Sequence, residues 1–169
     1  MLKRFYPSTI VDHIGQIDAA YFREHGIKGL IIDIDNTLVG WDILEPDEMV
    51  MQWIEVLKEA GLVICLLSNN SKERVTLFNK NLKLHAIHKA GKPRKPNFLK
   101  ALKLLKTKPC ETAVIGDQIF TDIWGGNRHR LHTILVSPIS KKEFRFIGFK
   151  RRLERIVLRS YHKNQLKKD

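Results

Sequence analysis

The chain has 169 residues, 43% of them hydrophobic, which is enough to bury a core as one domain over residues 1–169, and its net charge is +12. The segment Met1–Pro7 lacks the apolar stretch of a signal peptide, and the longest apolar run, Leu62–Leu67, is too short to cross a bilayer, so we expect a cytoplasmic protein. Cys65 and Cys110 form neither a disulfide framework nor a metal-binding spacing, which favours two free thiols.

Apolar runs of strand length recur along the chain, and helical patterns separate most of them. We expect strands at Gly29–Ile34, Leu62–Leu67, Thr112–Ile115 and Thr133–Val136. We expect helices from Pro46 to Gly61, from Ser71 to about Asn81, from Pro96 to Lys106 and, shorter, from Thr121 or Asp122 to Gly125. This alternation predicts an α/β fold, a Rossmann-like parallel sheet with helices on both faces.

Two of these helices show a clear apolar face. The residues expected to point inward are Met49, Val50, Trp53, Ile54 and Leu57 in the helix after Pro46, and Phe98, Leu99, Leu102 and Leu105 in the helix after Pro96.

The end of the chain, about residues 141–169, carries eleven Lys and Arg against three Asp and Glu. Phe149, Leu153, Ile156, Val157 and Tyr161 recur there at helical spacing, so we expect a basic amphipathic helix. Three roles stay open for this tail: contact with anionic lipid at the inner membrane face, contact with nucleic acid or a ribosome, and packing against the protein's own sheet with a solvated basic face.

Two carboxylates directly follow the apolar run Leu30–Ile32. Residues i and i+2 of a strand face the same side, so Asp33 and Asp35 start out on one face, within reach of a common ligand. Carboxylates this close repel each other unless a cation or a shared proton offsets their charge, and Mg²⁺ is the simplest cation.

Further polar residues fall where other predicted strands end. Ser68, Asn69 and Asn70 follow the second strand, Gly116 and Asp117 follow the third, and Lys92 lies in the loop before the Pro96 helix. Because ligands of open parallel sheets bind beyond the carboxyl ends of the strands, these residues are candidates for one site with Asp33 and Asp35.

In this order the residues resemble the motifs of the haloacid dehalogenase-like (HAD) superfamily. The resemblance covers about Gly29 to Val136. The matching groups are D-x-D-x-T at Asp33, Asp35 and Thr37, the serine Ser68, a lysine at Lys92 with Pro93 and Phe98 after it, and G-D-x-x-x-x-D at Gly116, Asp117 and Asp122. Lys95, also followed by proline, is the competing catalytic lysine.

The resemblance implies a phosphatase mechanism with defined roles. Asp33 would be the nucleophile that forms an aspartyl phosphate, and Asp35 the general acid and base. Mg²⁺ would be held by Asp33, the backbone carbonyl of Asp35, and Asp117, with Asp122 behind them orienting the lysine or a water. Phosphate binding would fall to Ser68, Lys92 and the backbone N–H of Asn69.

A narrower resemblance is to the subclass IIIA, YqeG-type phosphatases, which are similar to the mitochondrial phosphatidylglycerophosphate phosphatases. The segments between Thr37 and Ser68 and between Ser68 and Lys92 leave no room for a cap domain, which implies an open site for a bulky substrate such as a lipid head group. Two alternatives stay open: a non-enzymatic nucleic-acid or ribosome binder, and a phosphatase for nucleic-acid phosphate ends. Asn127, Arg128 and Arg130 are candidates for contact with a second anionic group.

Overall fold

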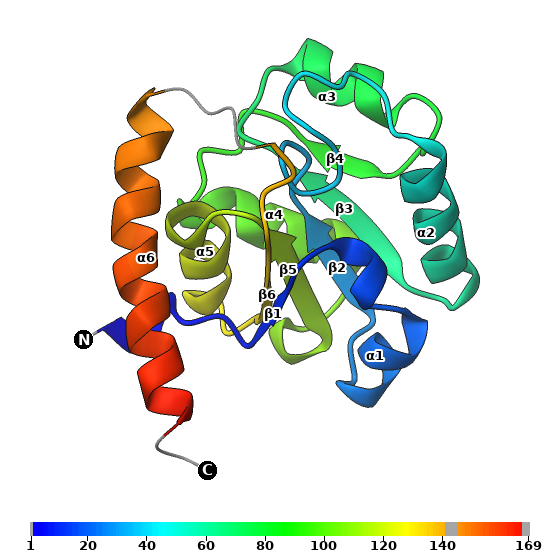
Figure 1. Ribbon diagram of the computed structural model, residues 1–169. Helices are drawn as coiled ribbons and strands as arrows, with labels where there is room; N and C mark the ends of the chain where they lie inside the picture. Colours follow the sequence, from blue (N-terminus) through cyan, green and yellow to red (C-terminus); the bar gives the residue numbers. More distant parts are fainter. Residues whose placement is uncertain (1, 141–144, 167–169) are drawn as a thin grey trace.

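The computed structural model describes residues 2–140 and 145–166, and for residues 145–151 it describes the helical backbone without the side chains. A six-stranded parallel sheet, in the order β1-β6-β5-β2-β3-β4, forms the centre of the molecule (Figure 1). The strands are β1 Thr9–Val11, β2 Gly29–Ile32, β3 Val63–Leu67, β4 His85–Ile87, β5 Thr112–Gly116 and β6 His132–Val136. The predicted α/β class with a parallel sheet is therefore confirmed.

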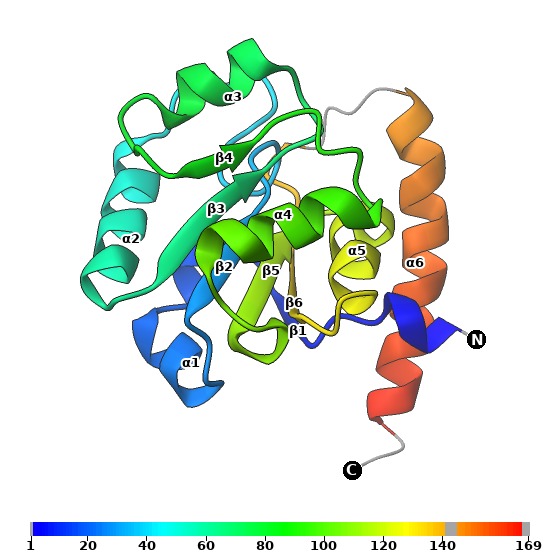
Figure 2. The same ribbon diagram turned by 180° about the vertical axis from the view of Figure 1, so that it is seen from behind.

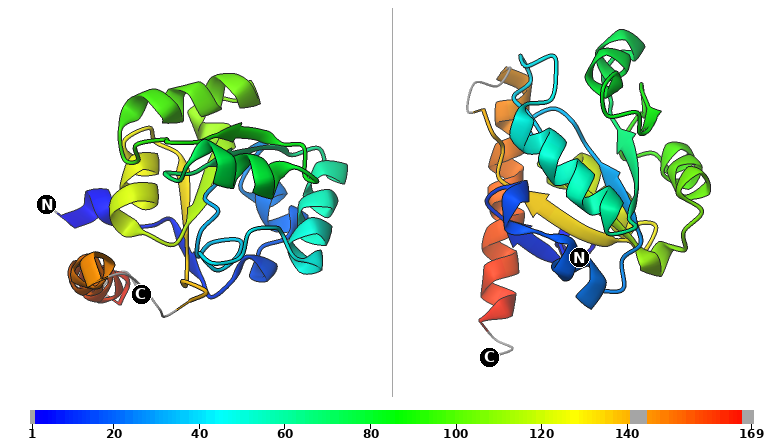
Figure 3. Two further views of the ribbon diagram at one scale, coloured as in Figure 1. Left: turned by 90° about the horizontal axis from the view of Figure 1, so that it is seen from above. Right: turned by 90° about the vertical axis from the view of Figure 1, so that its right-hand side faces the viewer.

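Helices flank both faces of this sheet. They are α1 Ala19–Glu24, α2 Glu48–Glu59, α3 Lys72–Asn79, α4 Lys95–Leu105, α5 Trp124–Asn127 and α6 Arg145–Gln165, with short turns η1 Leu2–Phe5, η2 Ile14–Gln16, η3 Pro109–Glu111 and the π-helical η4 Ile119–Ile123. The helices α1 and α2 cover one face, and α4 and α5 cover the other (Figures 2 and 3). The long helix α6 stands beside α5, next to the N-terminal segment (Figure 2).

The pleat of β2 shows how the sequence builds these two layers. Leu30 and Ile32 are fully buried against α1 and α2, whereas Ile31 is fully buried on the opposite face, against α4. A strand covered on both faces is expected to read as a continuous apolar run, and Leu30–Ile32 does so.

The predicted strands lie close to their observed positions, but two details of the carboxyl edge differ. The strand β2 ends at Ile32, so Asp33 and Asp35 lie in the turn after it. The π-helix η4 begins at Ile119 and not at Thr121 or Asp122. Two inward predictions were wrong, because Met49 and Leu99 are 50% and 48% exposed.

The helix α6 packs on the body of the protein through only part of its apolar stripe. Val157 is 3% exposed and joins a cluster with Ile119 and Leu135, while Leu153 and Ile156 are 41% and 55% exposed. The predicted packing against the protein is therefore confirmed for one side of the stripe. Residues 141–144 and 167–169 of the basic tail, and the side chain of Phe149, lie outside the described residues.

Within the part of the chain that the structure describes, none of the helices is long and apolar enough to cross a membrane. Both cysteines are free, with Cys65 buried in the sheet and Cys110 exposed, as expected.

Candidate active site

A polar cavity of about 310 Å³ opens at the carboxyl edge of the sheet, where β2, β3 and β5 end. Its lining residues are Asp33, Asp35, Ser68, Asn69, Asn70, Lys92, Gln118 and Thr121. Residues that lie far apart in the sequence meet here because the strands are parallel and adjacent. We call this cavity the polar cleft.

The turn after β2 places Asp33 at the base of the polar cleft. The backbone N–H of Asp33 donates to the carbonyl of Ile115 at 3.0 Å and so extends the β2–β5 pairing by one residue. The chain then reverses through Asn36, whose φ of +62° lies in the left-handed region that Asn tolerates. The Thr37 hydroxyl lies 3.5 Å from Asp33 Oδ2, so the threonine of the D-x-D-x-T motif faces back towards Asp33.

Lys92 is the cation at the centre of the site. It is 8% exposed, and its Nζ donates to Asp33 Oδ1 at 2.6 Å and to Asp122 Oδ1 at 2.7 Å. Burial alone would lower the pKa of Lys92, but the negative charges of Asp122 and Asp33 outweigh it and raise the pKa above its ordinary value. Lys95, the competing lysine, begins α4 and is exposed.

Burial also governs the nucleophile candidate, because it raises the pKa of Asp33 to about 7. The charge of Lys92 opposes this shift, while Asp122 and Asp35 add to it. A carboxylate held in this way is readily ionised by an additional cation, since an opposite charge nearby favours the charged form.

Three buried carboxylates form what we call the acidic cluster: Asp33, Asp117 and Asp122 offer oxygens that all lie within 4.8 Å of one another. Gly116 is necessary for this approach, because a Cβ at that position would overlap the Asp122 carboxyl carbon. Hard carboxylate oxygens at such spacing suit Mg²⁺. The donor set therefore fits a divalent cation such as Mg²⁺, and the roles of Asp33 and Asp117 as its ligands stay a prediction.

The side chain of Asp35 turns away from the acidic cluster, contrary to the expectation that strand geometry places Asp33 and Asp35 on one face. Arg74 donates from Nη2 to Asp35 Oδ1 at 3.1 Å, and Asn70 donates to Oδ2 at 3.2 Å. The reason is that β2 ends before Asp33, so the period-two rule does not apply there. The side chain of Asp35 therefore lies at the wall of the polar cleft and not in the acidic cluster.

Arg74 is a site residue that the sequence analysis missed. It is 8% exposed in α3, and besides Asp35 it donates to the carbonyls of Ile43 and Leu44 at 2.5 and 2.8 Å. One guanidinium thus joins the Asp35 carboxylate to the loop before α2. Its position near the helix N-cap Ser71 gives no local signal of this role, because both partners come from a distant segment.

Ser68 and Asn69 also line the polar cleft. Ser68 is 1% exposed, and its hydroxyl accepts from the Asn70 backbone N–H at 3.0 Å. The Asn69 side chain accepts from the Lys92 backbone N–H at 2.7 Å and so ties the β3 loop to the Lys92 loop. Both predicted residues therefore lie at the site.

Two residues after the fourth motif, Asn127 and Arg128, donate hydrogen bonds to backbone carbonyls of other segments. Asn127 donates to the carbonyls of Arg4 and Tyr6, each at 2.9 Å, and Arg128 donates to the carbonyl of Pro93 at 3.1 Å. Asn127, Arg128 and Arg130 do not line the polar cleft, and their contact with a second anionic group stays a prediction.

Solved structures with the same fold include phosphatases. An uncharacterised protein from Listeria monocytogenes serotype 4b matches with a TM-score of 0.56 and 18% identity, over 70% of this chain and 85% of that chain. The cobalt-bound form of the deoxy-D-mannose-octulosonate 8-phosphate phosphatase from Haemophilus influenzae matches with a TM-score of 0.53 and 17% identity, over 82% and 91%.

Two sequence relatives are named as phosphatases. The probable phosphatase YqeG of Bacillus subtilis (strain 168) is 40% identical over 94% of this chain and 92% of its own length. Phosphatidylglycerophosphate phosphatase 1, chloroplastic/mitochondrial, of Arabidopsis thaliana is 29% identical over 95% of this chain, which spans 49% of that protein. The sequence pattern of the haloacid dehalogenase-like hydrolases matches residues 18–130. The chain therefore belongs to the haloacid dehalogenase-like hydrolases, and its enzyme class is the phosphatase expected from its motifs.

Proposed function

We propose that the protein is a Mg²⁺-dependent phosphomonoester phosphatase that works through an aspartyl phosphate on Asp33. The observation that carries this proposal is the buried acidic cluster with Lys92 bonded to two of its members, at the floor of an open polar cleft. Charge is concentrated where a phosphoryl group would bind, and phosphoryl transfer is catalysed mainly by positioning and electrostatics.

In the first step, an Asp33 carboxylate oxygen attacks phosphorus, the bond from phosphorus to the ester oxygen breaks, and Asp35 gives its proton to the departing alcohol. In the second step, Asp35 takes a proton from water, the water oxygen attacks phosphorus, and phosphate leaves with Asp33 regenerated. Asp35 can exchange protons with the cleft because its side chain lines the wall and is not among the clustered carboxylates.

The other side chains bind and orient the phosphoryl group. Ser68 offers a hydroxyl, Asn69 a backbone N–H, and Lys92 a positive charge, all at the cleft. Asp122 holds Lys92 in place, since its own carboxylate also accepts from Thr121 at 3.1 Å and from the Gln118 backbone at 3.2 Å. Mg²⁺, held by Asp33, Asp117 and the Asp35 carbonyl, would neutralise phosphate charge so that a carboxylate can approach it.

The substrate that we propose is phosphatidylglycerophosphate or a closely related lipid phosphate. Support comes from the named activity of the Arabidopsis relative and from the short connections around the site, which hold α2, α3 and β4 and no cap domain. An open cleft accepts a phosphate presented at a bilayer. The basic helix α6 would provide the contact with anionic lipid, with Arg152, Arg155 and Arg159 exposed along it.

The test is a phosphate-release panel with Mg²⁺ that compares phosphatidylglycerophosphate in micelles, sugar phosphates, nucleotides and 5′- or 3′-phosphorylated oligonucleotides. We expect the lipid phosphate to give the highest kcat/KM and Asp33→Asn to be inactive on every substrate. A preference for the oligonucleotides would instead support the alternative, a phosphatase of nucleic-acid ends. No release from any substrate would favour the non-enzymatic alternative.

A further inference from the structure

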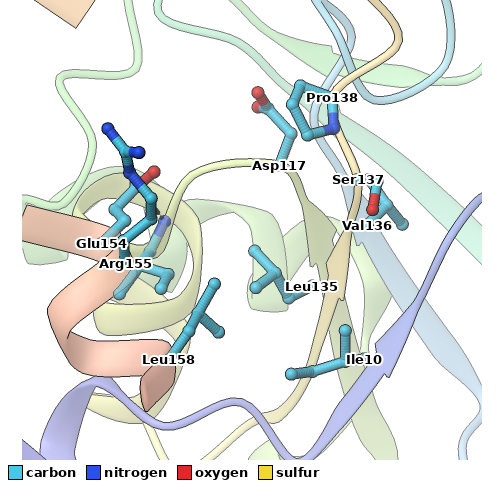
Figure 4. Close-up of a pocket in the computed structure, with 10 residues that line it drawn as sticks. Ile10, Asp117, Leu135, Val136, Ser137, Pro138, Glu154, Arg155 and Leu158 are labelled. Atoms are coloured by element: carbon cyan, nitrogen blue, oxygen red, sulfur yellow. Dashed lines mark hydrogen bonds between the residues drawn. The ribbon is translucent and has the colours of Figure 1, made fainter. Parts of the chain in front are cut away.

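A second cavity, of about 290 Å³, lies between α6 and the end of the sheet formed by β1 and β6 (Figure 4). We call it the α6 cavity. Its apolar walls come from β1, η4, β6, the segment after β6, and α6: Ile10, Ile119, Leu135, Val136, Pro138 and Leu158. Arg155 and Glu154 border it from α6.

The α6 cavity adjoins the candidate active site. Asp117 belongs to the acidic cluster and also lines the end of this cavity (Figure 4). On the other side of the same loop, Gln118 and Thr121 line the polar cleft. A ligand that occupied both would therefore pass the Asp117–Gln118 segment.

Polar contacts keep α6 at a fixed position over this cavity. At one end, the buried Glu154 accepts from the backbone N–H of Ile119 at 2.8 Å. At the other end, the Tyr6 hydroxyl lies 2.7 Å from the Ser160 hydroxyl, and Asn164 donates to Tyr6 at 2.8 Å. Among the described residues of α6 between these anchors, only Val157 is buried, and a cavity remains between α6 and the apolar side chains of the sheet.

We propose that the α6 cavity binds a hydrocarbon chain of the lipid phosphate whose head group reacts at Asp33. The proposal rests on the phosphatase function proposed above and adds the site for the apolar part of the substrate. Hydrocarbon is the ligand that matches the apolar walls, and a phosphate is the group that the neighbouring polar cleft binds. Arg155, exposed at the mouth on α6, complements an anionic group between the chain and the reacting phosphate.

The size of the cavity sets the length of chain that fits. A molecule of liquid water occupies roughly 30 Å³, and a methylene group is of similar size, so the α6 cavity accepts on the order of ten carbons. Each methylene transferred from water into an apolar site strengthens binding about fourfold. Affinity should therefore increase with chain length once the chain reaches past Asp117, and level off when the cavity is full.

The test is calorimetric binding of n-alkylphosphonates, ethyl to dodecyl, below their micellar concentrations and with Mg²⁺ present. Their carbon–phosphorus bond survives a phosphatase, so binding is measured apart from turnover. We expect the unmodified protein to bind decylphosphonate at least about tenfold more tightly than ethylphosphonate, because several more methylene groups are buried. Leu158→Trp, which fills the cavity from α6, should remove this chain-length dependence and leave ethylphosphonate affinity within about twofold.

Leu153→Trp is the matched control, because it adds the same bulk on the exposed side of α6 and should keep the full dependence. Ile10→Phe fills the cavity from the opposite wall and serves if Leu158→Trp does not fold. Equal affinity for all chain lengths in the unmodified protein, or full chain-length dependence in both filled variants, would overturn the proposal. Because phosphonate binding does not depend on turnover, failure of the phosphatase function would show separately, as absent phosphate release from every ester.

Discussion

Among the residues outside the recognised motifs, Arg74 is the one whose substitution we expect to change catalysis most. Its guanidinium holds the Asp35 carboxylate and pins the carbonyls of Ile43 and Leu44. Arg74 donates one hydrogen bond to the Asp35 carboxylate, and its bonds to two backbone carbonyls fix the guanidinium from which that bond comes. We therefore assign Arg74 as a positioning residue for the proposed general acid.

The first prediction follows from that assignment. Arg74→Met should lower kcat/KM for glycerol 3-phosphate, whose leaving alcohol needs a proton, by about tenfold to a hundredfold. For p-nitrophenyl phosphate, whose leaving group needs no acid, the loss should stay within about threefold. Arg74→Lys keeps the positive charge but loses the guanidinium, so its kcat/KM for glycerol 3-phosphate should lie between the values of the unmodified protein and of Arg74→Met. Equal losses on both substrates would show a purely structural role for Arg74.

The second prediction concerns the metal. Asp117 is 1% exposed and has no role in our scheme other than to hold the cation. Asp117→Ala should therefore weaken Mg²⁺ binding by about tenfold or more in calorimetry, and chelation should stop turnover of the unmodified protein until Mg²⁺ is restored. Asp42→Ala, which removes an exposed carboxylate outside the acidic cluster, is the control. Unchanged affinity in Asp117→Ala would remove Asp117 from the coordination shell.

At the scale of elements, the sequence predicts best where burial is uniform. Leu30–Ile32 reads as a strand because both faces of β2 are covered, and Ser71 predicts the start of α3 because its side chain accepts from the Arg74 backbone N–H at 3.3 Å. The strand β1, Thr9–Val11, is partly buried, only three residues long and at the sheet edge, so its pattern is too short to recognise.

Some features of the site could also be predicted from the sequence, and others could not. The motif residues Asp33, Ser68, Lys92 and Asp117 could be predicted because each lies directly beyond a strand or in a loop at the same edge. The direction of the Asp35 side chain could not, because it depends on Arg74 and Asn70, which the fold brings from other segments. The α6 cavity depends likewise on how a terminal helix is anchored.

The third prediction belongs to α6. Reversal of three exposed basic residues, Arg152, Arg159 and Lys163, to Glu should reduce co-sedimentation with acidic liposomes at low salt by about a hundredfold or more, since each basic residue near the surface contributes about 1 kcal/mol. Reversal of three exposed lysines elsewhere gives a control variant of the same net charge: Lys80 at the end of α3, and Lys100 and Lys103 on α4.

The control should keep most of the liposome binding at low salt, and both proteins should bind less at high salt. Equal binding by the two variants would show that net charge alone matters. Tight RNA binding without liposome binding would favour the nucleic-acid role of the tail.

At the scale of the whole molecule, His132 links segments that lie far apart in the sequence. Its Nε2 lies 2.8 Å from the Tyr21 hydroxyl of α1, and that hydroxyl lies 2.6 Å from Thr9 of β1. Burial, with a smaller contribution from His25, lowers the pKa of His132 below its ordinary value of 6.5. The folded protein therefore prefers the neutral ring.

The fourth prediction is the resulting pH dependence of stability. Below an unfolded-state pKa of 6.5 the unfolded chain binds the proton more readily, so the contribution of His132 is fully present above pH 6.5 and is lost as pH falls towards the folded pKa. The urea concentration at the unfolding midpoint should decrease as the pH is lowered from about 7.5 to about 5.5, and the decrease should be smaller in His132→Gln. An identical pH dependence in both proteins would contradict the shift.

The central claim, covalent catalysis by Asp33 with Asp35 as acid and base, is tested most directly by trapping the intermediate. Asp35→Asn should still be phosphorylated by p-nitrophenyl phosphate, whose leaving group needs no acid, but should hydrolyse the aspartyl phosphate slowly because the base is absent. Acid quenching followed by intact-mass and peptide analysis should find one phosphoryl group on Asp33 in this variant, and none when Asp33→Asn is added. Absence of any phosphorylated protein in Asp35→Asn, or its presence on another residue, would contradict the mechanism.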